Sequence, residues 1–245
     1  MVTSVAIVGA TGRMGQLATR LIEGSDDLRV HAGLGSSDPI DGITGADLVL
    51  DLTVPAASPE IVGAALDRGI PVLVGTSGWT SERITVLARR LQETPDLGVI
   101  IVPNFSLGSV LATLAATMLA PYFTSIEIVE AHHEGKVDSP SGTAIRTAEL
   151  IGVARGDAGP VAAPHADQRA RGQQVASVPI HSLRMSGLLA QQDVVFGGVG
   201  ETVRISHETL SDDSYAAGLL LGLRATHTAR GVVVGLDKLL DLGTR

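Results

Sequence analysis

The sequence has 245 residues, of which 44% are hydrophobic and 2% aromatic, and its formal net charge is -8. This length and hydrophobic content are typical of one large α/β domain or two smaller ones with a real core, and they exclude a disordered chain. The negative charge argues against nucleic-acid and anionic-membrane partners. The absence of cysteine excludes disulfides, thiolate nucleophiles and cysteine-ligated zinc.

Strands and helices alternate through the first 104 residues. Short apolar runs predict strands at 4–8, 28–34, 47–54, 70–76 and 98–104. Helices are predicted after the first strand, from Ser58 onward, and over 81–94, with Ser58 as the N-cap and Pro59 at the first helical position. This alternation indicates a parallel sheet flanked by helices.

The pattern changes after residue 104 and predicts an α+β block with a mostly non-alternating sheet. Residues 107–120 predict a buried helix, because the stretch is too short and too rich in Ser, Thr and Gly to span a bilayer. The other expected elements are strands at 125–133, 178–184, 192–198 and 201–207, helices at 143–154, 215–227 and 235–242, and a loop at 155–176. The N-terminus lacks the features of a signal peptide, so we expect a cytoplasmic protein.

Gly9, Gly12 and Gly15 follow the first strand and open the first helix. Glycines at such a turn let the backbone approach a pyrophosphate, and the helix start supplies N–H donors and a positive dipole. The position favours a dinucleotide site; a plain tight turn is the alternative. Arg13, at the helix start, either reaches a phosphate or is an ordinary surface arginine.

Two further loops, 75–79 and 102–106, follow predicted strands at the edge where open α/β sheets bind ligands. Asn104 and Phe105 lie at the crossover to the second block, so we expect a nicotinamide contact or a hinge there. Either loop could also be a plain connection.

The stretch 130–144, "EAHHEGKVDSPSGTA", concentrates chemical groups. His132 and His133 end a strand and therefore point to opposite sides, which predicts different roles. Lys136 adds a fixed positive charge. Residues 141–143 open a helix, where hydroxyls and free N–H groups can bind an anion, although each hydroxyl alone could be a simple N-cap. The combination favours a carboxylate substrate that exchanges a proton, and the acid spacing does not predict a metal site.

Six motifs together resemble the dihydrodipicolinate reductase family over nearly the whole chain: "VGATGRMG", "DLTVP", "VGTSGW", "VPNFSLG", "EAHHEGKVDSPSGTA" and "FGGVGETVRISH". The resemblance implies a Rossmann-type nucleotide-binding domain of residues 1–104 and 213–245. It implies an inserted α+β substrate-binding and oligomerisation domain of residues 105–212. It also implies a homo-oligomer, a tetramer, acting in lysine and diaminopimelate biosynthesis.

The implied reaction is the reduction of a cyclic dicarboxylate, 4-hydroxy-tetrahydrodipicolinate or dihydrodipicolinate, to tetrahydrodipicolinate by NADPH or NADH. By resemblance, His132 is the proton donor and acceptor, and Lys136 is a second proton donor. The substrate-binding positions are His133, Ser141, Gly142 and Thr143. The nucleotide-binding positions are Gly9, Ala10, Thr11, Gly12, Arg13, Met14, Gly75, Thr76, Ser77, Val102, Pro103, Asn104 and Phe105.

One position departs from the family pattern. The family usually has an acid at the end of the second strand for the ribose hydroxyls, and here that position is Gly35, followed by Ser36 and Ser37. The sequence therefore does not predict a strong NADH preference. Two alternative functions stay open at this point: another nicotinamide-dependent dehydrogenase, and a dinucleotide sensor without turnover.

Overall fold

The computed structural model describes residues 2–241 and divides into two compact units. Unit 1 consists of the chain up to Leu107 and from Asp212 onward, and unit 2 is the continuous stretch Gly108–Ser211. The chain thus leaves unit 1, completes unit 2, and returns.

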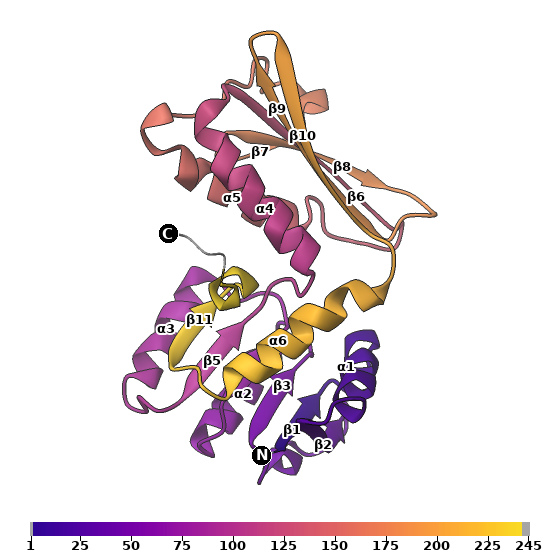
Figure 1. Ribbon diagram of the computed structural model, residues 1–245, viewed down its shortest axis with the longest axis vertical. Helices are drawn as coiled ribbons and strands as arrows, with labels where there is room; N and C mark the ends of the chain where they lie inside the picture. The colour runs from indigo at the N-terminus through magenta and orange to yellow at the C-terminus, as the bar shows by residue number, and fades with distance from the viewer. Residues whose placement is uncertain (1, 242–245) are drawn as a thin grey trace. The chain divides into compact units, whose positions relative to one another are not determined.

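Unit 1 contains a six-stranded parallel sheet in the order β11-β5-β4-β3-β1-β2 (Figure 1). The strands are β1 Thr3–Val8, β2 Leu28–Leu34, β3 Leu48–Asp51, β4 Val72–Val74, β5 Gly98–Ile101 and β11 Gly231–Val234. The predicted parallel sheet is confirmed. The sequence reading missed β11, a four-residue edge strand that pairs with β5.

Helices cover both faces of this sheet, which explains why its strands are near-continuous apolar runs. They are α1 Arg13–Glu23, α2 Ser58–Asp67, α3 Ser81–Leu91 and α6 Ala216–Thr226. Val72 and Val74 share a core cluster with buried residues of α2 and α3. Leu73, between them, lies against α6 at Gly222, as the alternation of a strand requires.

The prediction that Ser58 caps α2 is wrong by one position. Ala57 is the N-cap and Ser58 is the first helical residue. The reason is that the buried Ser58 hydroxyl donates to the Asp51 carboxylate instead of accepting from the helix backbone.

Unit 2 contains a five-stranded mixed sheet in the order β10-β9-β6-β8-β7, and this confirms the predicted second sheet. The strands are β6 Ser125–His132, β7 Gln173–Val175, β8 Val178–Arg184, β9 Ala190–Gly198 and β10 Glu201–Thr209. β6 runs parallel to β8 and antiparallel to β9. β7 lies inside the segment predicted as a loop.

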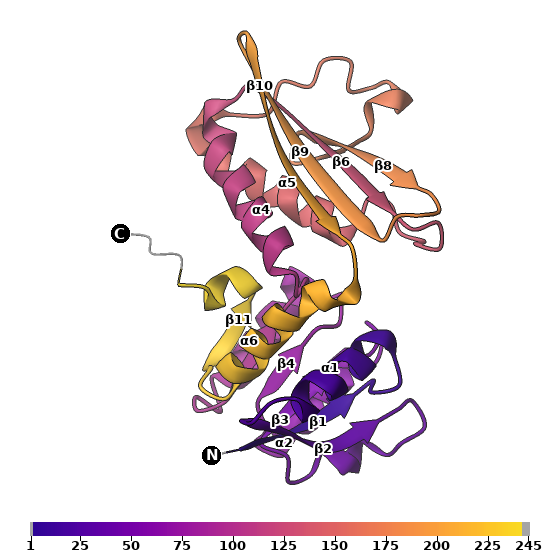
Figure 2. The ribbon, with the colours of Figure 1, turned by 45° about the vertical axis from the view of Figure 1, so that its right-hand side comes forward.

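Helices α4 Leu107–Leu119 and α5 Gly142–Arg155 lie along one face of this sheet (Figure 2). Their small residues, such as Ala116 and Ala148, share a core with Ile126 and Ile128 of β6 and with Phe196 of β9. The expectation that α4 is a buried helix is only partly right. The buried residues of α4 form a narrow stripe of Ser109, Thr113 and Ala116. Two large apolar side chains of the same helix, Leu111 and Met118, are exposed.

Six short 3-10 helices complete the described structure: Ile40–Ile43, Ala120–Tyr122, Gly156–Ala158, Arg169–Arg171, Asp212–Tyr215 and Leu236–Leu239. The last of these replaces the closing helix predicted over 235–242, and Leu242 lies outside the described residues. Across residues 2–241, the structure contains no helix long and apolar enough to cross a bilayer.

Candidate active site

The glycine loop joins β1 to α1 in unit 1, and close backbone approach fixes its glycines. Gly9 has a φ of 91°, and a Cβ there would lie 2.6 Å from the carbonyl oxygen of Leu52. A Cβ on Gly15 would lie 2.2 Å from the Gly9 oxygen. Gly12 is the N-cap of α1 and offers no side-chain acceptor, so the first amides of the helix have no cap. This arrangement fits the pyrophosphate of a nicotinamide nucleotide.

Arg13, at the same helix start, has a partner in unit 1. Its Nε lies 3.5 Å from an Asp212 carboxylate oxygen, and its side chain is still 60% exposed. Thr11 and Gly12 are also exposed, whereas Ala10 and Met14 are partly buried. The exposed loop atoms and the arginine are therefore accessible from solvent.

The end of β2 brings an acid near the loop that the sequence reading did not identify. The Gly35 amide donates to Asp38 Oδ2 at 2.7 Å. A Cβ on Gly35 would lie 3.4 Å from Thr11 Cγ2 and 3.5 Å from the same Asp38 oxygen. Asp38 lies beyond the strand end, and a turn folds it back, so a position count along the strand could not find it.

A buried carboxylate, Asp51, organises the loops after β3 and β4. Its Oδ1 accepts from the Thr53 amide at 3.0 Å and from the Thr76 hydroxyl at 3.1 Å. Its Oδ2 accepts from Ser58, whose oxygen in turn accepts from Trp79 Nε1 at 2.9 Å. Thr76, predicted to bind nucleotide, therefore uses its hydroxyl inside this network. Its neighbour Ser77 is exposed.

The loop after β5 holds the remaining predicted nucleotide residues. Phe105 is buried and fills the space beside Gly75, where a Cβ would lie 2.6 Å from its ring. Val102 is also buried, whereas Pro103 is exposed. Asn104 Oδ1 accepts from the Ser106 amide at 2.8 Å, which closes the turn before α4. The ring of Phe105 is thus a core group of unit 1.

In unit 2, His132 ends β6 and bonds to a fully buried carboxylate on the same strand. Its Nδ1 lies 2.6 Å from Glu130 Oε2, and the imidazole is 15% exposed. His133, the next residue, is exposed, as the alternation along a strand predicts. The Glu130 carboxylate also accepts two hydrogen bonds of 2.9 Å from the Arg184 guanidinium of β8. Sequence reasoning missed both Glu130 and Arg184.

Lys136 lies in the turn that follows β6. Its Nζ is 2.7 Å from Asp138 Oδ1 and 2.8 Å from Oδ2. The hydrogen bond from Lys136 lowers the pKa of Asp138 below its ordinary value. Arg184 donates to the Asp138 carbonyl oxygen at 2.6 Å. The lysine turn is therefore tied to the strand that carries His132.

The start of α5 has the features of an anion site. The buried Ser141 is the N-cap, and its hydroxyl accepts from the Ala144 amide at 3.2 Å. Gly142 is exposed, and a Cβ there would meet no atom within 4 Å. Thr143 is half-buried. The cap uses the Ser141 hydroxyl and the Ala144 amide, so the exposed Gly142 is the part of this helix start that is open to a carboxylate.

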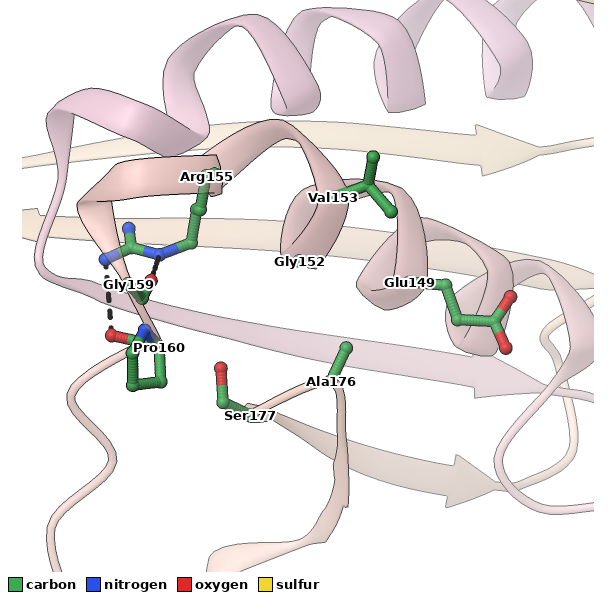
Figure 3. A pocket seen from close by; sticks show the side chains of 9 residues that line it. Glu149, Gly152, Val153, Arg155, Gly159, Pro160, Ala176 and Ser177 are labelled. Atoms are coloured by element: carbon green, nitrogen blue, oxygen red, sulfur yellow. Dashed lines mark hydrogen bonds between the residues drawn. The ribbon is translucent and has the colours of Figure 1, made fainter.

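A hollow in unit 2 lies apart from these residues, at the C-terminal end of α5. It has a volume of about 630 Å³, and Glu149, Val153, Arg155, Pro160 and Ser177 are among its lining residues (Figure 3). The buried Arg155 donates to the carbonyl oxygens of Gly159 and Ala120 at 2.6 and 2.7 Å. None of the predicted site residues lines this hollow, and its arginine stabilises the chain turn after α5.

The arrangement in each unit defines a class of protein. No group of three or more His, Asp or Glu side chains that could hold a metal ion occurs within residues 2–241. The parallel sheet with its glycine loop, and the separate unit with imidazole, ammonium and open helix start, define a nicotinamide-dependent oxidoreductase.

The comparisons identify the family. Residues 3–44 and 36–105 match the family described as dihydrodipicolinate reductase, N-terminus, and residues 106–240 match dihydrodipicolinate reductase, C-terminus. A 4-hydroxy-tetrahydrodipicolinate reductase of Clavibacter sepedonicus is 61% identical over 99% of this chain and 87% of its own. One of Streptomyces griseus subsp. griseus is 47% identical over 97% of this chain and 98% of its own. The chain belongs to the dihydrodipicolinate reductase family.

A solved structure agrees in fold. Dihydrodipicolinate reductase from Paenisporosarcina sp. TG-14, with bound dipicolinate, matches with a TM-score of 0.82 and 29% identity. The match covers 98% of this chain and 100% of that one. The predicted family, fold class and enzyme class are therefore confirmed, and the chain is an NAD(P)H-dependent oxidoreductase.

Proposed function

We propose that this enzyme reduces 4-hydroxy-tetrahydrodipicolinate, or dihydrodipicolinate formed from it, to tetrahydrodipicolinate in lysine and diaminopimelate biosynthesis. The observation that carries the proposal is the concentration of acid–base groups and an open helix start in residues 130–144. The bound dipicolinate of the Paenisporosarcina relative supports a cyclic dicarboxylate as substrate. A cytoplasmic location, as the sequence predicts, is part of the proposal.

We assign unit 1 to the nucleotide and unit 2 to the substrate. NADPH or NADH, when bound, supplies the hydride. The glycine loop and the first amides of α1 hold the pyrophosphate, and the loops after β4 and β5 border the nicotinamide. These loops are suited to that role because the Asp51 network and the packing of Phe105 fix their conformations.

Within unit 2, we assign His132 as the proton donor and Lys136 as a second donor. Addition of a hydride to a ring carbon of the substrate leaves an electron pair conjugated to the ring nitrogen. A proton from His132 neutralises this nitrogen, and solvent then reprotonates the imidazole. The product therefore gains one hydride and one proton. His133, Ser141, Gly142 and Thr143 are assigned to substrate binding.

The decisive test is oxidation of reduced cofactor by the purified protein with freshly made dihydrodipicolinate. Loss of absorbance that depends on this substrate is the expected result. A different dehydrogenase would require another imine or semialdehyde substrate, and a sensor would bind cofactor without turnover. Both alternatives would give no substrate-dependent loss of absorbance.

Removal of the Thr143 hydroxyl is expected to weaken substrate binding. A hydrogen bond to a charged group contributes about 1.5–3 kcal/mol, which corresponds to roughly 10- to 150-fold in KM. Thr143→Val should therefore raise the KM for dihydrodipicolinate, and Thr143→Ser, which keeps the hydroxyl, should change it little. Dipicolinate should compete with substrate for the wild-type enzyme. An unchanged KM in the valine variant, or no competition, would contradict the assignment.

Unit 2 is also expected to form the contacts of a homotetramer. Helices α4 and α5 cover one face of its sheet (Figure 2). The opposite face carries partly exposed apolar side chains such as Val129 and Val195. Leu183, on the same face, is 43% exposed. Pairing of such faces between copies would remove this apolar surface from water. Light scattering at micromolar concentration should give the tetramer mass, and a stable monomer would overturn this proposal.

A further inference from the structure

Glu130 is a buried group that the proposed mechanism does not yet use. It lies on β6 two residues before His132, and its side chain is fully buried. At least four hydrogen bonds, from β6, β8 and the start of α5, converge on its carboxylate. Its Oε2 accepts a hydrogen bond from His132 Nδ1 at 2.6 Å and one from Arg184 Nη1 at 2.9 Å. Its Oε1 accepts one from Arg184 Nη2 at 2.9 Å and one from the Ser141 amide at 3.2 Å.

The chemistry of this carboxylate determines which nitrogen of His132 carries hydrogen. Burial acts to raise the pKa of Glu130, but hydrogen bonds from His132 and Arg184 outweigh it and lower the pKa to about 2. Glu130 is therefore ionised at neutral pH and can only accept hydrogen bonds. A hydrogen bond between it and His132 requires the hydrogen on Nδ1, and this leaves Nε2 for proton exchange with a substrate.

The same carboxylate connects the two assigned proton donors. Arg184 balances the charge of Glu130 with a paired contact and also donates to the Asp138 carbonyl oxygen at 2.6 Å. The Asp138 carboxylate holds Lys136 Nζ at 2.7 Å. The Ser141 amide, at the N-cap of α5, donates to Glu130 as well. One buried anion thus fixes the imidazole, the lysine turn and the helix start.

We infer that Glu130 is a positioning residue that holds His132 in the Nδ1–H tautomer and so makes Nε2 the nitrogen that exchanges the proton. This inference rests on the proposed function for its catalytic meaning. The tautomer itself is a property of the free enzyme and needs no substrate. Glu130 acts through His132 and is not assigned a contact with substrate.

The first experiment reads the tautomer of His132 in the full-length wild-type enzyme. Nitrogen-15 NMR of labelled histidine, with His132 assigned by its loss in His132→Gln, should show a protonated Nδ1 and an unprotonated Nε2 in the neutral ring. A neutral His132 with its hydrogen on Nε2 would overturn the inference, whatever the variants do.

The second experiment replaces the carboxylate by an amide of the same shape. Glu130→Gln is expected to lower kcat by at least about 10- to 100-fold, the order of loss found when a carboxylate that orients a metal-bound imidazole is replaced. The KM should change less than kcat, and the Nδ1–H signature of His132 should weaken. Wild-type kcat together with an unchanged NMR signature in a folded Glu130→Gln protein would contradict the inference.

Glu127→Gln is a matched control. Glu127 lies on the same strand as Glu130 but on the other face of the sheet. Its carboxylate also contacts a histidine and an arginine: Oε2 lies 2.7 Å from His181 Nε2, and Oε1 accepts from Arg171. Glu127→Gln should keep the wild-type kcat when the variant and the wild-type enzyme are compared in the same oligomeric state. A loss of kcat equal to that of Glu130→Gln would show a general effect of disturbing β6 and overturn the specific role.

The proposed function and the role of Glu130 fail in different ways. If wild-type enzyme does not turn over dihydrodipicolinate, the proposed function fails while the NMR result stands. If wild-type enzyme turns over but His132 carries hydrogen on Nε2, the function stands and the role of Glu130 fails. If Glu130→Gln does not fold, the wild-type spectrum alone decides.

Discussion

Replacing His132 by alanine is expected to lower kcat by about 100-fold or more. The reason is that the developing charge on the substrate nitrogen would lose its proton donor while the binding groups at the start of α5 remain. The KM should therefore change much less than kcat. Steady-state kinetics with dihydrodipicolinate and a thermal melt of each variant measure both quantities.

His181→Ala is the matched control for this variant. His181 is also a partly buried histidine of unit 2, and its Nε2 lies 2.7 Å from Glu127 Oε2, a carboxylate of β6 on the face opposite Glu130. It should keep near-normal kcat. Lys136→Ala should lower kcat and raise KM together, because the ammonium serves both protonation and binding. Near-normal turnover of a folded His132→Ala protein would remove His132 from the mechanism.

Introducing an acid at Gly35 is expected to shift the cofactor preference towards NADH. The wild-type enzyme should use NADPH at least as well as NADH, because Gly35 neither accepts from the ribose hydroxyls nor repels a 2′-phosphate. Ser36 and Ser37 are exposed and can donate to phosphate oxygens. The side chain of Arg13 is 60% exposed and can supply a positive charge from the neighbouring glycine loop. Like-charge repulsion of about 1–3 kcal/mol in a partly solvated site corresponds to about 5- to 150-fold in kcat/KM.

The structure makes Gly35→Asp a practicable test. A Cβ at this position would lie 3.4 Å from Thr11 Cγ2 and 3.5 Å from Asp38 Oδ2, which is ordinary contact. Gly35→Ala controls for the added carbon alone and should keep the wild-type ratio. Titration of cofactor fluorescence gives the affinities for NADPH and NADH without turnover. An equal ratio in the aspartate variant would show that Gly35 does not face the ribose.

Asp38 provides the competing explanation for cofactor choice. Its carboxylate accepts from the Gly35 amide at 2.7 Å, so an acid is already present next to this position. If wild-type enzyme strongly prefers NADH, Asp38→Asn should relax that preference. Such a result would replace Gly35 by Asp38 as the residue that determines cofactor choice.

The sequence predicted the elements whose signal is local. The alternation of apolar runs located β1 to β5, and the residue types alone placed a helix start at 141–143, where the structure makes Ser141 the N-cap. The sequence analysis missed β11, because a strand of four residues at a sheet edge is too short to give a recognisable pattern. Ser58 was misplaced because its hydroxyl has a tertiary partner, Asp51, that helix-capping rules do not include.

The missing parts of the site are contacts between elements. Glu130 could have been suspected from its spacing, because residues two apart on a strand share a face and His132 follows it at that distance. Arg184 could not, since its place beside Glu130 depends on the parallel pairing of β6 and β8. Asp38 likewise depends on a turn after β2. Local patterns thus drew attention to the groups that are proposed to react, and tertiary pairing placed the residues that hold them.

The split of unit 1 between two distant chain segments has a consequence for the order of folding. Unit 2 is one uninterrupted stretch, and two of its strand pairs, β7 with β8 and β9 with β10, join near neighbours in sequence. The sheet of unit 1, in contrast, gains its edge only when β11 pairs with β5 across the whole of unit 2, and α6 packs beside α1 under the same constraint. Closing so long a loop costs entropy before any contact compensates for it, which makes such pairings slow. During synthesis, unit 2 can therefore fold first, while the sheet that begins the chain stays incomplete and exposed until the last strand emerges.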